Sequence, residues 1–453
     1  MAVTIQPADA ETHRPEPDPR NTREPSDGRV RGLALAFMGL AHLTVLDQRI
    51  KGALFALVEV AFIVTLPSLF HRIVGLVTLG SPHPELPTKD RDNSTFMMID
   101  GVIAVAIIAV FVGVYVISVR SAMQDLRLGA RYRPRSFRAQ ASAVANRSFP
   151  LIGLSPTVLL IAFFVVVPLV FSTLVAFTNY SSPEHVPPAN TVDWVGFDNF
   201  VTMFGGDATW TSALTRVFVW TTVWAILAVA TTYIGGMLLA IVLHEANIRF
   251  KPVYRAIFIL PYAIPAVVSM LVWRNMLNGA FGAVNTLLMD IGLIDSPVPW
   301  LSDPWLAKFV VVMIALWAGF PYFMLLTMGA MTAIPADLQE AAQIDGASKW
   351  QRFRYITLPM VLYQTAPLII MSLAMNFNNF GAIFFLTQGG PNVADTTTTG
   401  AGGTDILVSW IYQLTVGLMK YNYGAVIAVM IFLVMAPFAI FNFRRTRAFK
   451  GEM

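Results

Sequence analysis

The sequence contains no cysteine and few charged residues. Because none of its 453 residues is Cys, it has no disulfide framework, thiol nucleophile or thiolate metal site. Only 13% of the residues are charged, whereas an average soluble domain has roughly 25%. Hydrophobic residues make up 56% of the chain, so too few polar groups remain to cover a soluble protein of this length. The composition indicates an integral membrane protein.

Two further absences narrow the function. The chain has no Gly-x-x-x-x-Gly-Lys-Ser/Thr motif, so any ATP is expected to bind a separate polypeptide. It has only six His residues and no His/Asp/Glu cluster with metal-ligand spacing. A membrane enzyme is therefore disfavoured, and we expect this chain to bind no metal or cofactor itself.

Eight apolar segments are long enough, or nearly long enough, to cross a bilayer, which takes about 20 residues. They are 53–70, 101–118, 154–177, 217–243, 256–273, 309–328, 366–386 and 423–442. All 31 Lys and Arg residues lie outside these spans, as the cost of charge in lipid predicts. Among the acids only Glu59 lies within one, and we interpret it as a packing or interfacial residue rather than a proton carrier.

The distribution of basic residues predicts the orientation of the spans. Of the 31 Lys and Arg residues, 24 lie in one set of alternating segments and seven in the other set. The richer set is 1–52, 119–150, 244–255, 329–365 and 443–453. We therefore expect these segments, and both termini, to be cytoplasmic.

The chain is predicted to be all-α and to divide into four parts. Residues 1–30 hold five prolines and ten charged residues, which predicts a disordered cytoplasmic tail. Residues 31–150 would hold an interfacial helix at Gly32–Leu43, an accessory pair of spans and a basic cytoplasmic loop. A ninth span at Gly32–Leu43 is the alternative, and it would place the N-terminus outside. Residues 151–445 form the core, and 446–453 form a second cytoplasmic tail.

Several spans contain proline or glycine, and the outer loops contain tryptophan. Pro or Gly interrupts apolar runs at Pro261, Pro265, Gly319, Pro321 and Pro437. Each Pro removes a backbone donor and should kink its helix, either for packing or to line a cavity at mid-membrane. The outer loops hold Trp194, Trp210, Trp300 and Trp305, which we interpret as interface residues, with a docking surface as the alternative.

The most informative segment is 336–359, between the sixth and seventh spans. Pro335 precedes a run of helix formers, and Asp337 and Glu340 lie in the first turn, where the helix dipole favours them. Gly346 suits a helix end, because Gly tolerates the left-handed conformation. A second short helix is predicted from about Ser348 to Ile356, stopping at Pro359. The segment is therefore predicted to be a helix–turn–helix on the cytoplasmic face.

This segment resembles the EAA loop of binding-protein-dependent ABC importer permeases. The matching residues are Glu340, Ala341, Ala342, Gly346, Ile356, Leu358 and Pro359. The resemblance implies a type I ABC importer permease fold. It also implies that the loop is a coupling helix that docks on an ATP-binding subunit, where ATP and Mg are bound.

A wider resemblance, from roughly 150 to 445, is to the MalF-type permeases of maltose and maltodextrin importers. It rests on 316–322 (LWAGFPY), 376–380 (NFNNF), 387–391 (TQGGP) and Thr404–Asp405. It implies a mid-membrane sugar site formed by Gly319, Tyr322, Ser372, Asn376 and Asn379. The departures from the family pattern are Met375 in place of an aromatic residue, Ala315 in place of an amide, and a short second outer loop at 178–216.

Helical spacing points to the same polar site independently. Ser372, Asn376 and Asn379 lie at i, i+4 and i+7, which predicts one shared helix face. These groups could bond neighbouring helices, or they could bind sugar hydroxyls, which both donate and accept.

The resemblance implies a permease subunit in the cell membrane that imports a maltose- or maltodextrin-like sugar by alternating access. Its partners would be a homologous second permease, two ATP-binding subunits, an extracytoplasmic solute-binding protein and the lipid bilayer, with no nucleic acid. Another sugar or glycerol phosphate is an alternative substrate, although the spans hold no basic residue for a phosphate. An ion-coupled secondary transporter is the alternative from a different class.

Overall fold

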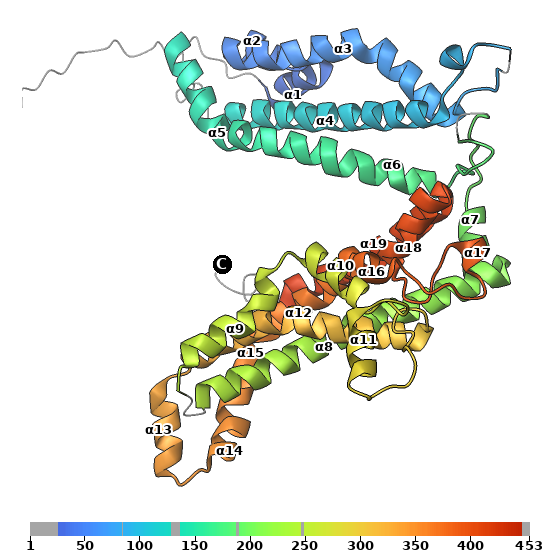
Figure 1. Cartoon of the computed structure of the whole chain (residues 1–453). Coiled ribbons are helices and arrows are strands. Elements are labelled where there is room, and N and C mark those ends of the chain that lie inside the picture. The colour runs from blue at the N-terminus through green and yellow to red at the C-terminus, as the bar shows by residue number, and fades with distance from the viewer. Residues whose placement is uncertain (1–25, 84, 128–135, 187–189, 246–248, 446–453) are drawn as a thin grey trace, which may run out of the picture. The chain divides into compact units, whose positions relative to one another are not determined.

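The computed structural model describes residues 26–445 except 84, 128–135, 187–189 and 246–248. Within these residues the fold is helical, and β pairing is limited to a single bridge between Thr178 and Trp194. The chain divides into two compact units, the first formed by residues up to Ser81 with Asp92–Leu169, the second by Pro82–Arg91 with Val170 onwards. Figure 1 shows the helices of each unit.

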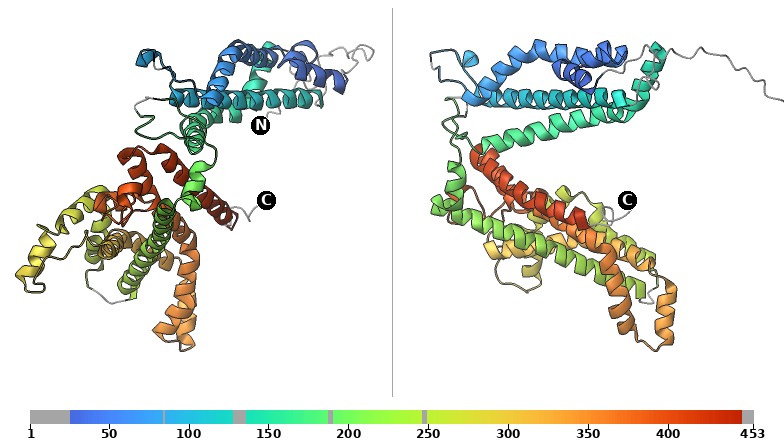
Figure 2. Two further views of the ribbon diagram at one scale, coloured as in Figure 1. Left: turned by 90° about the vertical axis from the view of Figure 1, so that its right-hand side faces the viewer. Right: turned by 180° about the vertical axis from the view of Figure 1, so that it is seen from behind.

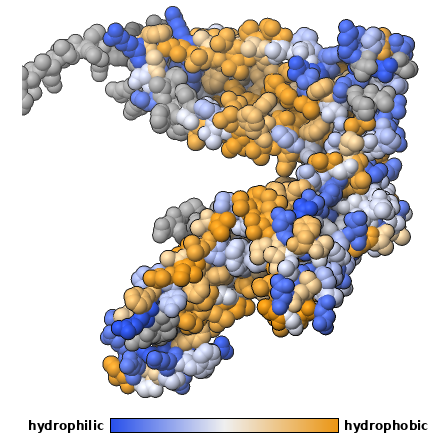
Figure 3. Space-filling view, in the orientation of Figure 1, coloured by the Kyte–Doolittle hydropathy of each residue, from blue (hydrophilic) through white to orange (hydrophobic). Residues whose placement is uncertain are grey.

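Among the described residues, seven helices are long and apolar enough to cross a membrane, and a bent pair of helices brings the number to eight if it counts as one span. The seven stretches are Arg49–Thr78, Ser94–Arg127, Gly153–Val175, Ala208–His244, Pro304–Thr332, Lys349–Phe377 and Tyr421–Asn442, and the bent pair is Lys251–Ala263 with Ala266–Met276. Each contains most of one predicted span. Figure 3 shows apolar side chains over the long helices and hydrophilic ones at the tip formed by residues 336–352.

In the first unit, helices α3 (Arg49–Thr78) and α4 (Ser94–Arg127) pack along their lengths, followed by α5 (Phe137–Ile161). The buried carboxylate of Glu59 accepts a hydrogen bond from the backbone N–H of Met38. The packing interpretation of Glu59 is therefore consistent with its contacts.

The N-terminal tail is shorter than the sequence predicted. Helix α1 begins at Asp27, inside the predicted disordered tail, because Val30 and Ala34 are buried against Ala122 and Leu126 of α4. The rest of that tail, up to residue 25, and the second tail at 446–453 lie outside the described residues. The single interfacial helix predicted at Gly32–Leu43 is instead two short helices, α1 (Asp27–Ala36) and α2 (Leu40–Thr44), separated at the left-handed Gly39.

The second unit is built around α8 (Ala208–Glu245), which packs against α12 (Pro304–Thr332) and α15 (Leu358–Phe377). Figure 2 shows these helices side by side from two directions. The other helices of this unit are α7 (Asp198–Val201), α9 (Lys251–Ala263), α10 (Ala266–Met276), α11 (Ala283–Asp290), α13 (Ala336–Ile344), α14 (Lys349–Arg352), α16 (Phe380–Thr387), α17 (Thr396–Thr399), α18 (Leu407–Tyr412) and α19 (Tyr421–Arg445). Helix α6 (Val167–Val175) contains the point at which the chain passes from the first unit to the second.

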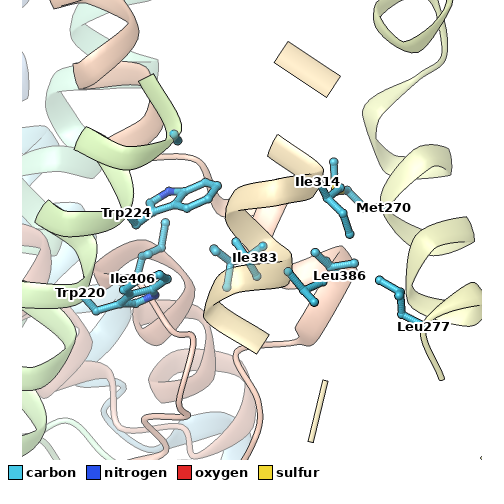
Figure 4. Close-up of a cluster of buried hydrophobic side chains, with 11 residues drawn as sticks. Trp220, Trp224, Met270, Leu277, Ile314, Ile383, Leu386 and Ile406 are labelled. Carbon is cyan, nitrogen blue, oxygen red and sulfur yellow. The ribbon is translucent and has the colours of Figure 1, made fainter. Parts of the chain in front are cut away.

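One hydrophobic cluster joins α8, α10, α12 and α16. In this cluster Ile383 of α16 lies between Trp220 and Trp224 of α8 on one side and Ile314 of α12 on the other (Figure 4). Both indoles also donate to backbone carbonyls, Trp224 to Asn376 at 3.1 Å and Trp220 to Thr404 at 3.0 Å. The cluster therefore fixes the carboxyl end of α15 as well as filling the core.

Two predicted spans are broken rather than continuous. The fifth bends by 87° between α9 and α10, because Pro265 has no N–H and disfavours helical geometry at Ile264. The seventh, predicted at 366–386, crosses a break at Asn378–Asn379, where α15 ends and α16 begins. Pro321 and Pro437, by contrast, lie inside uninterrupted helices.

The interface interpretation is wrong for Trp210. Its ring is buried, with its centroid 4.3 Å from that of Tyr423 and 6.4 Å from that of Trp410. Trp305, in contrast, is 79% exposed. Of these two Trp residues near span ends, Trp210 therefore packs in the core, whereas Trp305 lies on the surface.

Helices α8 and α12 approach closely at glycines. A Cβ added at Gly236 would lie 2.6 Å from both the carbonyl oxygen of Phe320 and the nitrogen of Met324. Small residues at a helix crossing allow this backbone contact in membrane proteins.

We expect Gly236→Val to separate these helices and to destabilise the protein by about 1–3 kcal/mol, the usual cost of overpacking. Thermal unfolding of the purified protein in detergent would measure this. Gly329→Ala on the neighbouring helix α12 is the control, since its Cβ would meet nothing within 4 Å. Equal melting temperatures for the two variants would contradict the close-packing interpretation.

Candidate substrate cavity and helical hairpin

A cavity of about 970 Å³ lies in the second unit among α8, α9, α10, α12, α15 and α16. Its lining has no charged side chain and combines aromatic rings, amides and hydroxyls with aliphatic groups. The aromatic residues are Tyr262, Tyr322, Phe323, Phe380 and Phe385, and the polar ones include Thr232, Ser269, Ser372, Asn376, Asn378 and Asn379. The volume lies within the range of about 300–1,000 Å³ that small-molecule sites occupy.

Both helix breaks border this cavity. Ile264 and Pro265, between α9 and α10, contribute to its lining, and so do Asn378 and Asn379, between α15 and α16. A backbone break within a membrane helix frees polar groups, which are tolerated where they meet protein or a cavity. The Asn376 carbonyl at the second break is satisfied by the Trp224 indole.

The structure brings the five sequence-predicted substrate residues together. Gly319 and Tyr322 of α12, Ser372 and Asn376 of α15, and Asn379 all line the cavity. The predicted reason is wrong for Asn379, which does not share a helix face with the other two. It lies beyond the end of α15, and its side chain caps α16 by accepting a hydrogen bond from the Ala382 N–H at 3.2 Å.

The amides are partly held by local contacts. The Asn376 side-chain nitrogen donates to the Ser372 carbonyl at 2.9 Å, and the Asn378 side-chain nitrogen donates to the Ala374 carbonyl at 3.2 Å. Asn and Asp side chains compete in this way with regular backbone bonding. The same competition explains why the helix ends in this Asn-rich segment.

Sequence reasoning missed Tyr262, Asn378 and Ser269 as lining residues. Tyr262 lies between Pro261 and Pro265 at the bend, and its ring centroid is 6.3 Å from that of Tyr322. The signal for Tyr262 was its position between two prolines. Met375, which departs from the family pattern, is 64% exposed, and it lines the cavity together with Ala315.

Gly319 offers no polar side-chain group, and its lack of a side chain allows α12 to pack closely on α8. A Cβ at this position would lie 2.7 Å from the Thr232 methyl group on α8. The Thr232 hydroxyl, meanwhile, donates to the Ala228 carbonyl at 2.5 Å. The wall between α8 and α12 is therefore closely packed and internally satisfied.

The segment 336–359 forms a hairpin of α13 and α14. Gly346 has φ +77° and ends α13 in the left-handed conformation, as predicted. Ser348 begins α14 through a capping box with Gln351. The Gln339 amide donates to the Thr357 hydroxyl at 3.1 Å, which joins the two arms.

The second arm does not stop at Pro359. A π-helical turn at Phe353–Thr357 leads directly from α14 into α15, so Pro359 lies in the first turn of α15, where a missing N–H is tolerated. Of the predicted coupling residues, Glu340, Ala341, Gly346 and Pro359 are exposed, and Ala342, Ile356 and Leu358 are half-buried. The hairpin is therefore a rigid extension of a membrane helix.

Comparison with known proteins identifies the family. The family described as "Binding-protein-dependent transport system inner membrane component" matches residues 233–447. The galactooligosaccharides transport system permease protein GanP of Bacillus subtilis (strain 168) is 38% identical over 407 residues, which are 89% of this chain and 94% of GanP. The chain is a permease of the binding-protein-dependent transport family.

Other similar permeases are named for maltose and maltodextrin transport. The maltodextrin permease MalC of Streptococcus pneumoniae serotype 4 is 35% identical over 419 residues, 89% of this chain and 93% of MalC. The maltose/maltodextrin permease MalF of Klebsiella aerogenes is 40% identical over 267 residues, 58% of this chain and 51% of MalF. The predicted resemblance to the MalF-type family is confirmed.

A solved structure supports the fold. A bacterial ABC transporter involved in the import of the acidic polysaccharide alginate aligns with a TM-score of 0.54 and 22% identity, covering 68% of this chain and 98% of that chain. The family match and the named relatives make the chain a helical transport component rather than an enzyme, and a multi-pass inner-membrane protein.

The loop between α16 and α18 is fastened to the end of α8. The Arg216 guanidinium donates to Asp395 at 2.7 Å and to the Gly402 carbonyl at 2.8 Å. The carboxylate of Asp405, which is 2% exposed, accepts from the Gly402 N–H at 2.8 Å and from the Ser409 hydroxyl at 2.6 Å. These contacts hold the loop in one conformation beside the cluster shown in Figure 4.

Burial raises the pKa of Asp405 to about 6, although the hydrogen bonds from Ser409 and Gly402 and the charge of Arg216 act in the opposite direction. Because the folded protein then holds this proton more tightly than the unfolded chain, stability should fall as the pH rises from about 4 to about 6. Asp405→Asn removes this titration.

We expect the melting temperature of Asp405→Asn to rise relative to wild type as the pH increases from 4.5 to 7, and differential scanning fluorimetry would measure it. The exposed Asp290 provides the control substitution, Asp290→Asn. A constant difference between wild type and Asp405→Asn across this range would show that Asp405 does not titrate there.

Proposed function

We propose that this permease imports a neutral oligosaccharide of the maltodextrin type, by alternating access of the cavity described above. The observation that carries the proposal is the uncharged lining of amides, hydroxyls and aromatic rings between two broken helices. Discontinuous helices at mid-membrane are a recurrent way of building a transporter site.

The chemistry of the lining suits a sugar. A sugar hydroxyl both donates and accepts hydrogen bonds, as an amide side chain does, so Asn376 and Asn379 can pair with it in either direction. The Tyr322 ring, near that of Tyr262, offers an apolar face for the C–H side of a sugar ring. Ser372 supplies a further hydroxyl, and Gly319 allows α12 to pack closely on α8 beside them.

The absence of charge among the lining residues favours a neutral solute over glycerol phosphate or an acidic sugar, since a phosphate or carboxylate would call for a cation. The named relatives transport maltodextrins and galactooligosaccharides, which are both neutral. The flexible Met375 in place of an aromatic ring makes the wall adaptable.

The hairpin is proposed to couple transport to ATP. Glu340, Ala341, Ala342 and Gly346 would meet an ATP-binding subunit, while Ile356, Leu358 and Pro359 join the hairpin to α15. ATP and Mg would bind that separate subunit and not this chain. A continuous helix from Lys349 to Phe377 supports rigid transmission, because it connects the hairpin to Ser372 and Asn376.

The assembly proposed is a pair of homologous permeases with two ATP-binding subunits and an extracytoplasmic solute-binding protein. The bent pair α9–α10 counts as one span, which gives eight spans with both termini cytoplasmic, as the basic residues predict. Within this arrangement the first two spans are accessory to the importer core.

The alternative of an ion-coupled transporter would need a titratable group along the path. Among the acids, Glu59 was the candidate, and its carboxylate already accepts a backbone N–H. Sugar uptake into vesicles that lack the ATP-binding subunits would favour this alternative.

We expect Asn376→Ala to raise the KM for sugar uptake roughly tenfold, because up to two hydrogen bonds of about 0.5–1.5 kcal/mol each are lost. Uptake by the complex reconstituted in proteoliposomes would measure this. The control is Asn146→Ala, at an exposed position of α5. Unchanged KM with normal assembly would remove Asn376 from the site.

We expect Gly346→Pro to abolish sugar-stimulated ATP hydrolysis, because φ near −65° cannot replace +77° at the hairpin turn. Gly346→Asn is the matched variant, since Asn tolerates the left-handed region, and it should retain most of the activity. ATPase activity of the reconstituted complex, with and without sugar, would distinguish them. Full stimulation in Gly346→Pro would contradict the coupling role.

A further inference from the structure

The first turn of α10 borders the cavity without a cap. The helix starts at Ala266 after the 87° bend, and its N-cap, Pro265, has no side chain that could accept a hydrogen bond from it. The first backbone bond of the helix runs from the Ser269 N–H to the Pro265 carbonyl at 3.1 Å. The N–H groups of Ala266, Val267 and Val268 therefore have no hydrogen bond within the described part of the chain.

Ser269 lies one residue further along the same helix. It lines the cavity and is only 5% exposed, and its hydroxyl has no hydrogen-bond partner among the described residues. Buried polar groups are nearly always hydrogen-bonded, so an unpaired one requires an explanation. The hydroxyl of Thr232, another buried lining residue, is by contrast satisfied by the Ala228 carbonyl at 2.5 Å.

The unpaired hydroxyl is free to turn. A serine side chain moves among three staggered rotamers, and no hydrogen bond holds the Ser269 oxygen in its present one. Ser269 lines the cavity beside the uncapped first turn of α10. A neutral polar group that enters the cavity can then meet both the hydroxyl and the uncapped N–H groups beside it.

We infer that Ser269 is a specificity-determining residue that binds one hydroxyl group of the transported sugar, together with the uncapped first turn of α10. This inference rests on the proposed function. It adds a second polar subsite at the α9–α10 break, distinct from the amides at the α15–α16 break. A sugar that spans the cavity is held by its hydroxyls at both breaks. Tight binding therefore requires both the right length and the right positions of the hydroxyls.

Uptake by the complex reconstituted in proteoliposomes tests the inference, with maltotriose and galactobiose as probes. Ser269→Ala should raise the KM of the transported sugar about five- to tenfold, as expected for the loss of about one hydrogen bond. Its melting temperature should stay the same or rise, because the substitution removes an unpaired buried hydroxyl. Ser118→Ala is the matched control, since Ser118 is also buried with an unpaired hydroxyl but does not line the cavity.

Analogues of the transported sugar that each lack one hydroxyl provide the sharper readout. For wild type, the KM of one analogue should exceed that of the intact sugar. The factor should be about the same as the factor by which Ser269→Ala raises the KM of the intact sugar. Ser269→Ala should no longer discriminate against that analogue, because the two changes remove the same interaction. A purely structural serine would leave the discrimination unchanged.

The outcomes separate this inference from the function on which it rests. An unchanged KM in Ser269→Ala, with Asn376→Ala impaired, overturns the Ser269 subsite alone. A lower melting temperature in Ser269→Ala with unaltered discrimination among the analogues also overturns it. Normal uptake in both variants removes both residues from the site, whereas a wild-type complex that moves neither sugar overturns the proposed function itself.

Discussion

The central constraint on this permease is that a helix broken within the membrane must satisfy the backbone groups it frees. Lipid offers no hydrogen bonds, so a break is stable only against protein or a polar cavity. Here two breaks, at Ile264–Pro265 and Asn378–Asn379, border one cavity. The Trp224 indole satisfies one freed carbonyl at the second break, and the first break retains an uncapped helix end. The polarity of the cavity therefore comes from backbone, amide and hydroxyl groups, and none of the described lining residues is charged.

The surrounding structure keeps these breaks in place. The cluster around Trp220 and Trp224 fills the space between α8, α10, α12 and α16 (Figure 4). The loop after α16 is tied to α8 through Arg216 and Asp395, although these residues are 179 positions apart in the sequence. The same element that positions the cavity also leads into the hairpin, because α14 continues through a π turn into α15. Site and hairpin thus share one helix.

Local and strongly constrained features could be predicted from the sequence. The hairpin turn at Gly346 followed from a single residue with a known conformational preference, and the spans followed from the exclusion of charge from lipid. The five proposed substrate residues line one cavity, although Asn379 does so for a reason other than helical spacing. An apolar run that contains Asn reads as a helix face, and only tertiary contacts show that the helix ends there.

The remaining differences also arise from tertiary packing. A helix begins at Asp27, inside a charged, proline-rich segment, because Val30 and Ala34 are buried against α4. Trp210 is buried because Trp410 and Tyr423 lie beside it. Tyr262 was overlooked because a ring between two prolines has no periodic signature. Ser269 was overlooked because one serine in an apolar run is unremarkable until its hydroxyl is found without a partner.

The glycine contacts between α8 and α12 have a mechanical consequence. With backbone against backbone at Gly236, and Gly319 against Thr232, neither helix can slide along the other without forcing atoms into overlap. The two helices should therefore move together as one rigid body during the transport cycle. Bending would then concentrate at the two corners beside the cavity, so the sugar would sit at the hinges of the moving parts rather than within a rigid block.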